Sequence, residues 1–191
     1  MRCFVAIDLP AEVRAAVTRA QARLRGDAPD ADVRWTDGEQ LHVTVKFLGA
    51  VADDRVPAVS SALEAAVGDA PAIALAAVGL GAFPSLRRPR VLWAGLTAGA
   101  AELARLAAAI DRALGPLGFP AEGRPFSAHV TIGRVRSPRG AGALAPAVEQ
   151  AGAVELGSWT ASELVLYESR LRSAGALHLS VSRHAMRGGR A

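Results

Sequence analysis

The chain has 191 residues, and its 22 basic side chains against 18 acidic ones give a formal net charge of +4. Apolar residues make up 51% of the chain, but 42 of them are alanines, so the bulky core is smaller than that fraction suggests. A chain of this length buries roughly 70% of its unfolded surface and needs no crosslink to fold, and the single cysteine, Cys3, excludes an internal disulfide.

The N-terminal segment and the charge balance indicate where the protein works and what it binds. The first apolar run reaches Asp8 too early for a secretory signal peptide, and no stretch approaches the ~18 apolar residues of a membrane span. We therefore expect one cytoplasmic domain with no membrane partner. The basic balance, carried by arginines and one lysine, Lys46, suits an anionic partner such as RNA.

The hydrophobic pattern predicts strands that alternate with helices. In chain order we expect a strand at 3–9, a helix at 12–25, a strand at 41–48, a helix at 53–67, a strand at 71–80, a loop at 81–85, a strand at 90–96, a helix at 101–114, a strand at 127–135, a helix at about 141–151, and strands at 159–167 and 177–183. This order predicts an α+β fold with antiparallel sheets and helices on the outside.

The strand at 41–48 alternates between apolar and polar side chains. Val43, Val45 and Phe47 share one parity and are expected to face the core. His42, Thr44 and Lys46 share the other parity, which faces a cleft or solvent.

An internal repeat relates the two halves of the chain. A shift of 87 positions places His42-Val43-Thr44-Val45 on His129-Val130-Thr131-Ile132, and the helices at 12–25 and 53–67 on those near 99–114 and 141–151. We therefore expect a single bilobal domain, 1–191, built from a duplicated unit. A pseudo-twofold axis would bring the two His-x-Thr strands face to face.

The paired His-x-Thr motifs carry the expected chemistry. With six threonines in the chain, a given histidine is followed by threonine at the second position about once in 30 by chance, yet two of four histidines have it. On a strand, His42 and Thr44 project from one face, as do His129 and Thr131. Two opposed imidazoles can act as general acid and general base in a phosphoryl displacement, and the hydroxyls can donate to phosphate oxygens.

A cation near the phosphate would offset its charge. Lys46 lies on the parity of His42, although a solvated strand lysine explains it equally well. The equivalent place in the second half is Gly133, followed by Arg134, whose guanidinium suits bidentate phosphate binding. A surface arginine explains Arg134 equally well, and Lys46 and Arg134 are the candidate phosphate-binding residues.

The motif pair resembles the signature of the 2H phosphoesterases. The flanking segments FVAIDLP (4–10), FLG (47–49), GAFP (81–84), RPRVLW (88–93), LGFP (117–120) and LYES (166–169) resemble the RNA 2′,3′-cyclic phosphodiesterases of bacteria and archaea, also called the 2′-5′ RNA ligase branch. The resemblance covers nearly the whole chain. The first motif has Val45 where the family usually has leucine, a change expected to point into the core.

The resemblance implies a bilobal α+β fold with two antiparallel sheets around a central cleft. It also implies that His42 is the proton donor and His129 the proton acceptor, without metal or other cofactor; residue chemistry alone leaves these two roles symmetric. The expected partner is an RNA with a 2′,3′-cyclic phosphate terminus, opened to a 2′-phosphomonoester, with 2′-5′ ligation as the reverse reaction.

Three alternatives remain open at the level of sequence. The substrate could be a small cyclic nucleotide or an ADP-ribose cyclic phosphate. A hydrolase that binds a metal through His42 and His129 would need a further ligand at suitable spacing, and none is found. A non-catalytic RNA-binding module would not require the paired motifs.

The remaining histidines and the tryptophans are expected to have structural roles. Parity places His178 opposite its apolar neighbours, as a structural or surface residue, and His184 lies near the Arg-rich end and is expected to be solvated. Trp35 and Trp93 are expected to pack rather than to stack on a nucleobase, and Cys3 to be buried.

Overall fold

The computed structural model describes residues 1–172 and 175–188. Its elements in chain order are β1 (Arg2–Asp8), α1 (Ala11–Asp27), β2 (Val33–Trp35), η1 (Gly38–Gln40), β3 (His42–Ala50), η2 (Asp53–Arg55), α2 (Val56–Val67), β4 (Ile73–Phe83), β5 (Val91–Ala98), α3 (Ala100–Leu114), η3 (Gly115–Leu117), β6 (His129–Val135), η4 (Ala141–Ala143), α4 (Leu144–Ala151), β7 (Glu155–Ala161), β8 (Glu163–Arg172) and β9 (Gly175–Ala185), where η marks a 3-10 helix. Every expected helix is present in this α+β fold, and every expected strand overlaps one or two observed strands.

Three local differences separate the expected elements from the observed ones. The three-residue strand β2 was not expected, because so short a segment shows no period. The strand expected at 159–167 is two strands, β7 and β8, which are separated at Ser162. Part of the loop expected at 81–85 is strand, because residues 81–83 pair with β5. There the ring of Trp93 lies where a side chain on Gly81 would stand, which confirms that Trp93 packs.

The strands described form one antiparallel sheet in the order β7-β4-β5-β6-β3-β1-β8-β9, with β2 paired to β6. The two halves of this sheet meet at a single pair, Val43 of β3 and Val130 of β6. The two expected sheets are therefore joined at their centre. Each lobe takes strands from both halves of the sequence, since β4 pairs with β5 and β8 pairs with β1.

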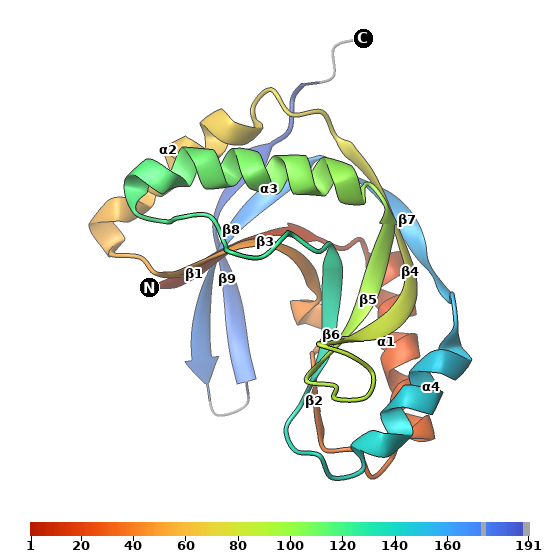
Figure 1. Cartoon of the computed structure of the whole chain (residues 1–191). Coiled ribbons are helices and arrows are strands. Elements are labelled where there is room, and N and C mark those ends of the chain that lie inside the picture. Colours follow the sequence, from red (N-terminus) through yellow and green to blue (C-terminus); the bar gives the residue numbers. More distant parts are fainter. Residues whose placement is uncertain (173–174, 189–191) are drawn as a thin grey trace.

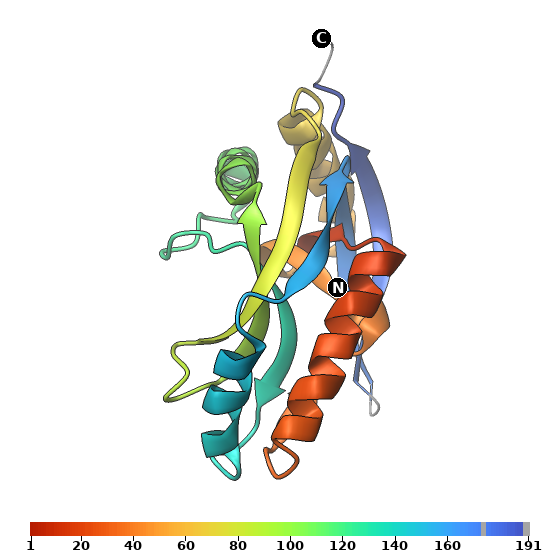
Figure 2. The same ribbon diagram turned by 90° about the vertical axis from the view of Figure 1, so that its right-hand side faces the viewer.

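The helices cover the sheet in two pairs (Figure 1). Helices α2 and α3 contact each other, α2 packs against β9, and α3 contacts β3, whereas α1 and α4 pack beside each other against β7 and β4. Figure 2 shows α1 and α4 from the side of the sheet that they cover. Apolar residues at helical spacing face the core in α1, where Val13, Val17 and Leu24 are buried. No helix in the described part of the chain has the length and apolarity of a membrane span.

Matching β-bulges interrupt the two central strands. In β3, Thr44 pairs with Ala6 and Lys46 with Val5, which leaves Val45 as an extra residue. In β6, Thr131 pairs with Trp93 and Gly133 with Leu92, which leaves Ile132 extra. These two residues are 87 positions apart, as the repeat requires, and each bulge reverses the faces of the side chains that follow it.

Candidate active site

The junction of β3 and β6 brings the two His-x-Thr motifs together. Val43 and Val130 pair directly and are fully buried, so the residues on either side of them project from the opposite face of the sheet. Continuing the antiparallel register places His42 beside Thr131 and Thr44 beside His129. The two imidazoles thus lie on one diagonal and the two hydroxyls on the other.

A cavity of about 530 Å³ opens on this face. Of the expected site residues, its lining includes His42, Thr44, Thr131 and Arg134. His129 is not among the lining residues, although it shares the strand face of Thr131. None of the described residues that line the cavity is an aspartate or glutamate. The cavity therefore suits an anionic ligand.

Each catalytic candidate imidazole is held by a backbone carbonyl two residues earlier in the chain. Nδ1 of His42 lies 2.7 Å from the carbonyl oxygen of Gln40, and Nδ1 of His129 lies 2.7 Å from that of Ser127. A carbonyl can only accept, so each Nδ1 carries a proton and donates it. In the neutral imidazole, Nε2 is then the nitrogen that can accept a proton from another group.

Burial controls the charge of both imidazoles. It lowers the pKa of His42 to about 4, against the opposing effect of the Gln40 carbonyl. It also lowers the pKa of His129, helped by the nearby charge of Arg134 and opposed by the Ser127 carbonyl. Both histidines are therefore neutral at pH 7 in the empty site. Smaller effects distinguish His42: the Asp8 carboxylate raises its pKa, and the charge of His178 lowers it.

Aromatic side chains surround His42. Its ring stacks on Phe4, with centroids 4.8 Å apart, and meets His178 edge-on at 5.2 Å. Phe4 also stacks on Tyr167 at 5.3 Å. His178 of β9 lines the cavity and therefore belongs to the site. Strand parity predicted that its side chain leaves the apolar face of β9. The sequence could not show that the opposite face borders the cavity rather than solvent.

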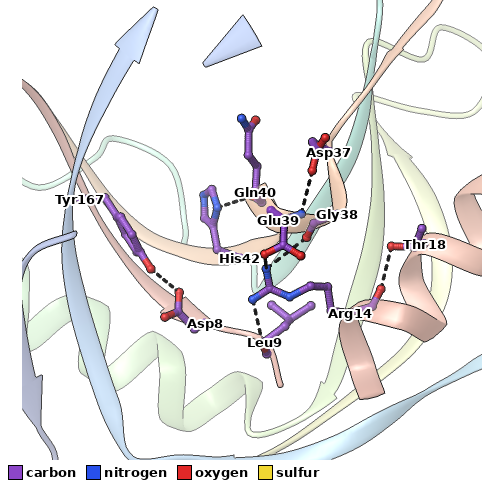
Figure 3. A network of polar contacts seen from close by, with 10 residues as sticks. All are labelled: Asp8, Leu9, Arg14, Thr18, Asp37, Gly38, Glu39, Gln40, His42 and Tyr167. Carbon is purple, nitrogen blue, oxygen red and sulfur yellow. Dashed lines mark hydrogen bonds and ion pairs between the residues drawn. The ribbon is translucent and has the colours of Figure 1, made fainter. Parts of the chain in front are cut away.

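A polar network fixes the turn that precedes His42 (Figure 3). The guanidinium of Arg14, on α1, donates to the carbonyl oxygens of Leu9 (3.2 Å) and Gly38 (3.3 Å) and pairs with the Glu39 carboxylate at 3.3 Å. Gly38 and Glu39 belong to η1, which ends at Gln40, the residue whose carbonyl accepts from His42. Arg14 therefore connects helix α1 to the support of the imidazole.

A second polar pair lies on the other side of His42. The hydroxyl of Tyr167 donates to the carboxylate of Asp8 at 2.6 Å, and Arg183 pairs with the same carboxylate at 3.5 Å. Asp8 is the direct partner of His42 in the β1–β3 pairing. Burial and the Asp8 carboxylate raise the pKa of Tyr167 far above its usual range, so this phenol stays protonated. Asp8 thus supplies a fixed negative charge beside His42.

The expected role of Lys46 in phosphate binding is wrong. Its side chain turns inward after the bulge at Val45 and is 3% exposed. The ammonium pairs with Asp111 of α3 at 2.5 Å and donates to the carbonyl of Pro120 at 2.7 Å. The same bulge turns Phe47 outward: it was expected in the core, yet it is 59% exposed and lines the cavity.

His184 is also placed differently from the expectation. It was expected to be solvated, but it is 3% exposed. Its Nδ1 lies 3.0 Å from the carboxylate of Glu64 on α2, and its Nε2 lies 2.9 Å from the hydroxyl of Ser182. Contacts with a helix distant in sequence bury this residue. Cys3 is buried as expected, and Trp35 contributes to the cavity lining.

No three or more histidine, cysteine, aspartate or glutamate side chains gather at a metal-binding distance among residues 1–172 and 175–188. The functional groups at the centre of the site are the two imidazoles of His42 and His129 and the two hydroxyls of Thr44 and Thr131. This set can transfer protons and donate hydrogen bonds to phosphate oxygens.

Comparisons with known proteins identify the family to which the chain belongs. The family model described as LigT like Phosphoesterase matches residues 7–93 and 96–178. An RNA 2′,3′-cyclic phosphodiesterase of Methanothermobacter thermautotrophicus is 32% identical over 178 residues, which cover 93% of this chain and 95% of that protein. A solved structure from Thermus thermophilus has a TM-score of 0.83 at 28% identity, with 100% of both chains covered. LigT of E. coli, in a crystal structure with 3′-AMP, has a TM-score of 0.76 at 26% identity, with 97% of both chains covered. Since the family model and the archaeal relative both span most of the sequence, this chain belongs to the LigT-like phosphoesterase family.

Proposed function

We propose that this protein hydrolyses RNA ends bearing a 2′,3′-cyclic phosphate to 2′-phosphomonoesters, by metal-independent catalysis with His42 and His129. The observation that carries the proposal is the antiparallel pairing of the two His-x-Thr motifs across Val43 and Val130. The name of the archaeal relative, RNA 2′,3′-cyclic phosphodiesterase, supports the substrate. The 3′-AMP bound to LigT supports a nucleotide phosphate in this cavity.

The proposed reaction is an in-line displacement at phosphorus. Nε2 of His129 takes a proton from water as the water oxygen bonds to phosphorus. The bond between phosphorus and the ribose O3′ breaks, and His42 gives its proton to that oxygen. The products are a 2′-phosphate and a free 3′-hydroxyl. One proton is taken up and one is given away, so His129 ends charged and His42 ends neutral.

The assignment of donor and acceptor follows the resemblance to the family, and the neighbouring fixed charges, taken without burial, agree with it. Asp8 lies beside His42 and raises its pKa, whereas Arg134 lies near His129 and lowers its pKa. Burial outweighs Asp8 in the empty site, so His42 is neutral there at pH 7. A bound phosphate anion raises the pKa of both imidazoles. When His42 carries the proton, the Asp8 carboxylate stabilises the charged imidazole.

Thr44 and Thr131 are the proposed donors to the non-bridging phosphate oxygens. Each stands beside the histidine of the opposite motif and lines the cavity. Arg134 also lines the cavity, and it is the proposed cation that offsets the phosphate charge. No contribution from Lys46 is included, because its ammonium is held by Asp111.

Alanine substitutions test these roles. His42→Ala and His129→Ala should each lower kcat by about 10²–10⁴-fold, since each removes a general acid or base. Thr44→Ala and Thr131→Ala should cost less, because the acid-base pair remains. Thr160→Ala, on the exposed face of β7, is the control. Losses below tenfold in both histidine variants, with melting temperatures unchanged, would exclude the two-histidine mechanism.

The isomer of the product tests the orientation of the ribose. A defined oligonucleotide with a cyclic phosphate end should yield a 2′-phosphate and no 3′-phosphate. The assay is run with excess chelator, under which the rate should not change, because the proposed donors need no metal. A 3′-phosphate product would reverse the placement of His42 and His129 around the phosphorus. Restoration of a chelator-sensitive rate by a divalent ion would contradict the metal-independent reaction.

The reverse reaction and the cellular location belong to the same proposal. Run backwards, the site would join a cyclic phosphate end to a 5′-hydroxyl through a 2′-5′ linkage, with water as the competing nucleophile. The single cysteine supports a cytoplasmic location, where thiols stay reduced.

A further inference from the structure

Two arginines face each other on neighbouring strands at the flank of the cavity. Arg34 of β2 pairs directly with Arg134 of β6. Directly opposed residues in an antiparallel pair project from the same face. Both side chains are exposed and both line the cavity. Like charges in this arrangement destabilise a sheet. The Arg34–Arg134 pair therefore does not stabilise the fold, and we ask what it binds.

The part of the chain that the structure describes does not neutralise this pair. Among the described residues, no carboxylate forms an ion pair with either guanidinium, and no acidic side chain lines the cavity. The acidic residues nearest in sequence to Arg34 are engaged elsewhere: Asp32 accepts from Ser137 at 2.8 Å, and Asp37 accepts from the backbone of Glu39 at 2.9 Å. Both guanidinium groups are therefore available to an anionic ligand in the cavity.

The pair lies beyond the reacting centre along β6. His129, Thr131 and Arg134 share the cavity face of this strand, and Arg134 is three residues past Thr131. Three strand residues span roughly 10 Å. A phosphate held between the two His-x-Thr motifs therefore leaves the Arg34 side of the cavity for another group of the same substrate. Guanidinium groups bind phosphate oxygens through two parallel hydrogen bonds.

We propose that Arg34, which stands opposite Arg134, binds the phosphodiester that joins the cyclic-phosphate nucleotide to the rest of the RNA, while Arg134 offsets the charge of the reacting phosphate. This inference rests on the proposed function and specifies its substrate. An RNA of two or more nucleotides carries the anion that fills the subsite, whereas a cyclic mononucleotide does not. Arg34 is thus a specificity residue that selects RNA ends over small cyclic nucleotides.

A comparison of two substrates tests the subsite. The probes are a ribodinucleotide ending in a 2′,3′-cyclic phosphate and the matching cyclic mononucleotide. The natural protein should have a kcat/KM about tenfold higher on the dinucleotide, the gain expected from a charged hydrogen-bonded contact. Arg34→Gln should abolish most of this ratio, mainly through KM. Arg19→Gln, the same charge change on the outer face of α1, should preserve it.

Two further measurements isolate the charge. A dinucleotide with an uncharged methylphosphonate linkage should lose the advantage with the natural protein, without any mutation. The slope of log kcat/KM against log salt on the charged dinucleotide should become shallower by about 0.7 in Arg34→Gln, as expected for one lost phosphate contact on a single strand. Arg19→Gln should leave the slope unaltered.

The outcomes separate this subsite from the proposed function. Equal kcat/KM on the mononucleotide and dinucleotide, or a ratio that Arg34→Gln and Arg19→Gln change alike, would overturn the subsite while the cyclic phosphodiesterase activity stands. Failure of the natural protein to hydrolyse either substrate would overturn the proposed function and the subsite with it.

Discussion

In β3, the extra residue Val45 decides the direction of the side chains that follow it. Val45 and Lys46 are consecutive and both buried, which breaks the alternation of a half-buried strand, and Phe47 is exposed instead. As a result, Lys46, a residue type that often binds phosphate, is buried against Asp111. Phe47, a residue type that is usually buried, lines the cavity. In β6, the equivalent bulge turns Arg134 toward the cavity.

Replacement of Lys46 tests its structural role. Lys46→Met removes the charge that pairs with Asp111 and should lower the free energy of unfolding by about 3 kcal/mol, because the Asp111 carboxylate and the Pro120 carbonyl lose their donor. Urea unfolding measures this loss. Since Lys46 does not line the cavity, kcat/KM of the folded fraction should change less than about threefold. A large loss of activity at unaltered stability would return Lys46 to the phosphate site.

The pH dependence of kcat/KM tests the charge states of the two imidazoles. This parameter reports the empty enzyme, in which burial lowers the pKa of His42 to about 4 and that of His129 below 6.5. One imidazole must be charged and the other neutral, so kcat/KM should be maximal between pH 4 and 6.5. Above that range both are neutral and the rate should fall.

Substitution of His178 gives a directed shift of that profile. The charge of His178 lowers the pKa of His42. His178→Gln should therefore raise the pKa of His42 and move the acidic limb of the kcat/KM profile to higher pH. The reference is the natural protein over about pH 3.5–8. A maximum above pH 7, unaffected by His178→Gln, would show that the burial of His42 does not set its pKa in solution.

At the scale of elements, helix α1 supports the active site through the turn before β3. Arg14 joins the end of β1 to η1, and the last residue of η1 supplies the carbonyl that orients His42. The second half has no equivalent: the position 87 residues after Arg14 is Ala101, and the preceding 3-10 helix, η3, ends at Leu117, ten residues before Ser127. The two histidines are therefore held with unequal support, although the backbone hydrogen bond of each is the same.

Substitution of Arg14 tests this support. Arg14→Gln should lower kcat about tenfold with a smaller change in KM, because a misplaced imidazole weakens the transition state more than binding. Loss of the Gln40 carbonyl contact should also lower the pKa of His42, since that contact raises it, and move the acidic limb of the pH profile downward. Arg14→Lys should restore part of kcat.

The control for Arg14 is another arginine of the same helix. Arg23→Gln removes an exposed ion pair with Asp27 and should change neither kcat nor the pH profile. If Arg14→Gln lowers stability but leaves the pH profile of the folded fraction unaltered, Arg14 stabilises the fold without positioning His42.

For the whole molecule, the buried histidines make stability depend on pH. The pKa of His42 is about 4 in the folded chain and about 6.5 when unfolded. Between these values the unfolded chain binds more protons, so the free energy of unfolding rises with pH. Stability is complete above 6.5 and is lost as the pH falls toward 4, by roughly 3 kcal/mol for this imidazole. The lowered pKa values of His129 and His178 act in the same direction.

Urea unfolding between about pH 4 and 7.5 measures this dependence. Other groups titrate in the same range, so the informative comparison is His42→Gln, which should show a smaller loss of stability on acidification than the natural protein. Parallel pH curves for the two proteins would mean that His42 titrates alike in the folded and unfolded chains.

The sequence alone determined the features that depend on local pattern. Hydrophobic periods gave the helices and most strands, because a helix or strand face is a property of neighbouring residues. The internal repeat identified the two His-x-Thr motifs. The segments that flank these motifs indicated the family, and the comparisons confirm it. The roles of His42, His129, Thr44, Thr131 and Arg134 stay predictions, tested by the substitutions above.

Only the tertiary structure decided which of the polar side chains meet at the site. His178 enters the cavity because β9 pairs with β8, and Arg34 opposes Arg134 because β2 pairs with β6, a hundred residues away. Lys46 and His184 are buried by partners on α3 and α2. Strand parity shows that a side chain leaves the core face, but a bulge can reverse it, and whether the other face meets solvent, a helix or a cavity depends on segments distant in the chain.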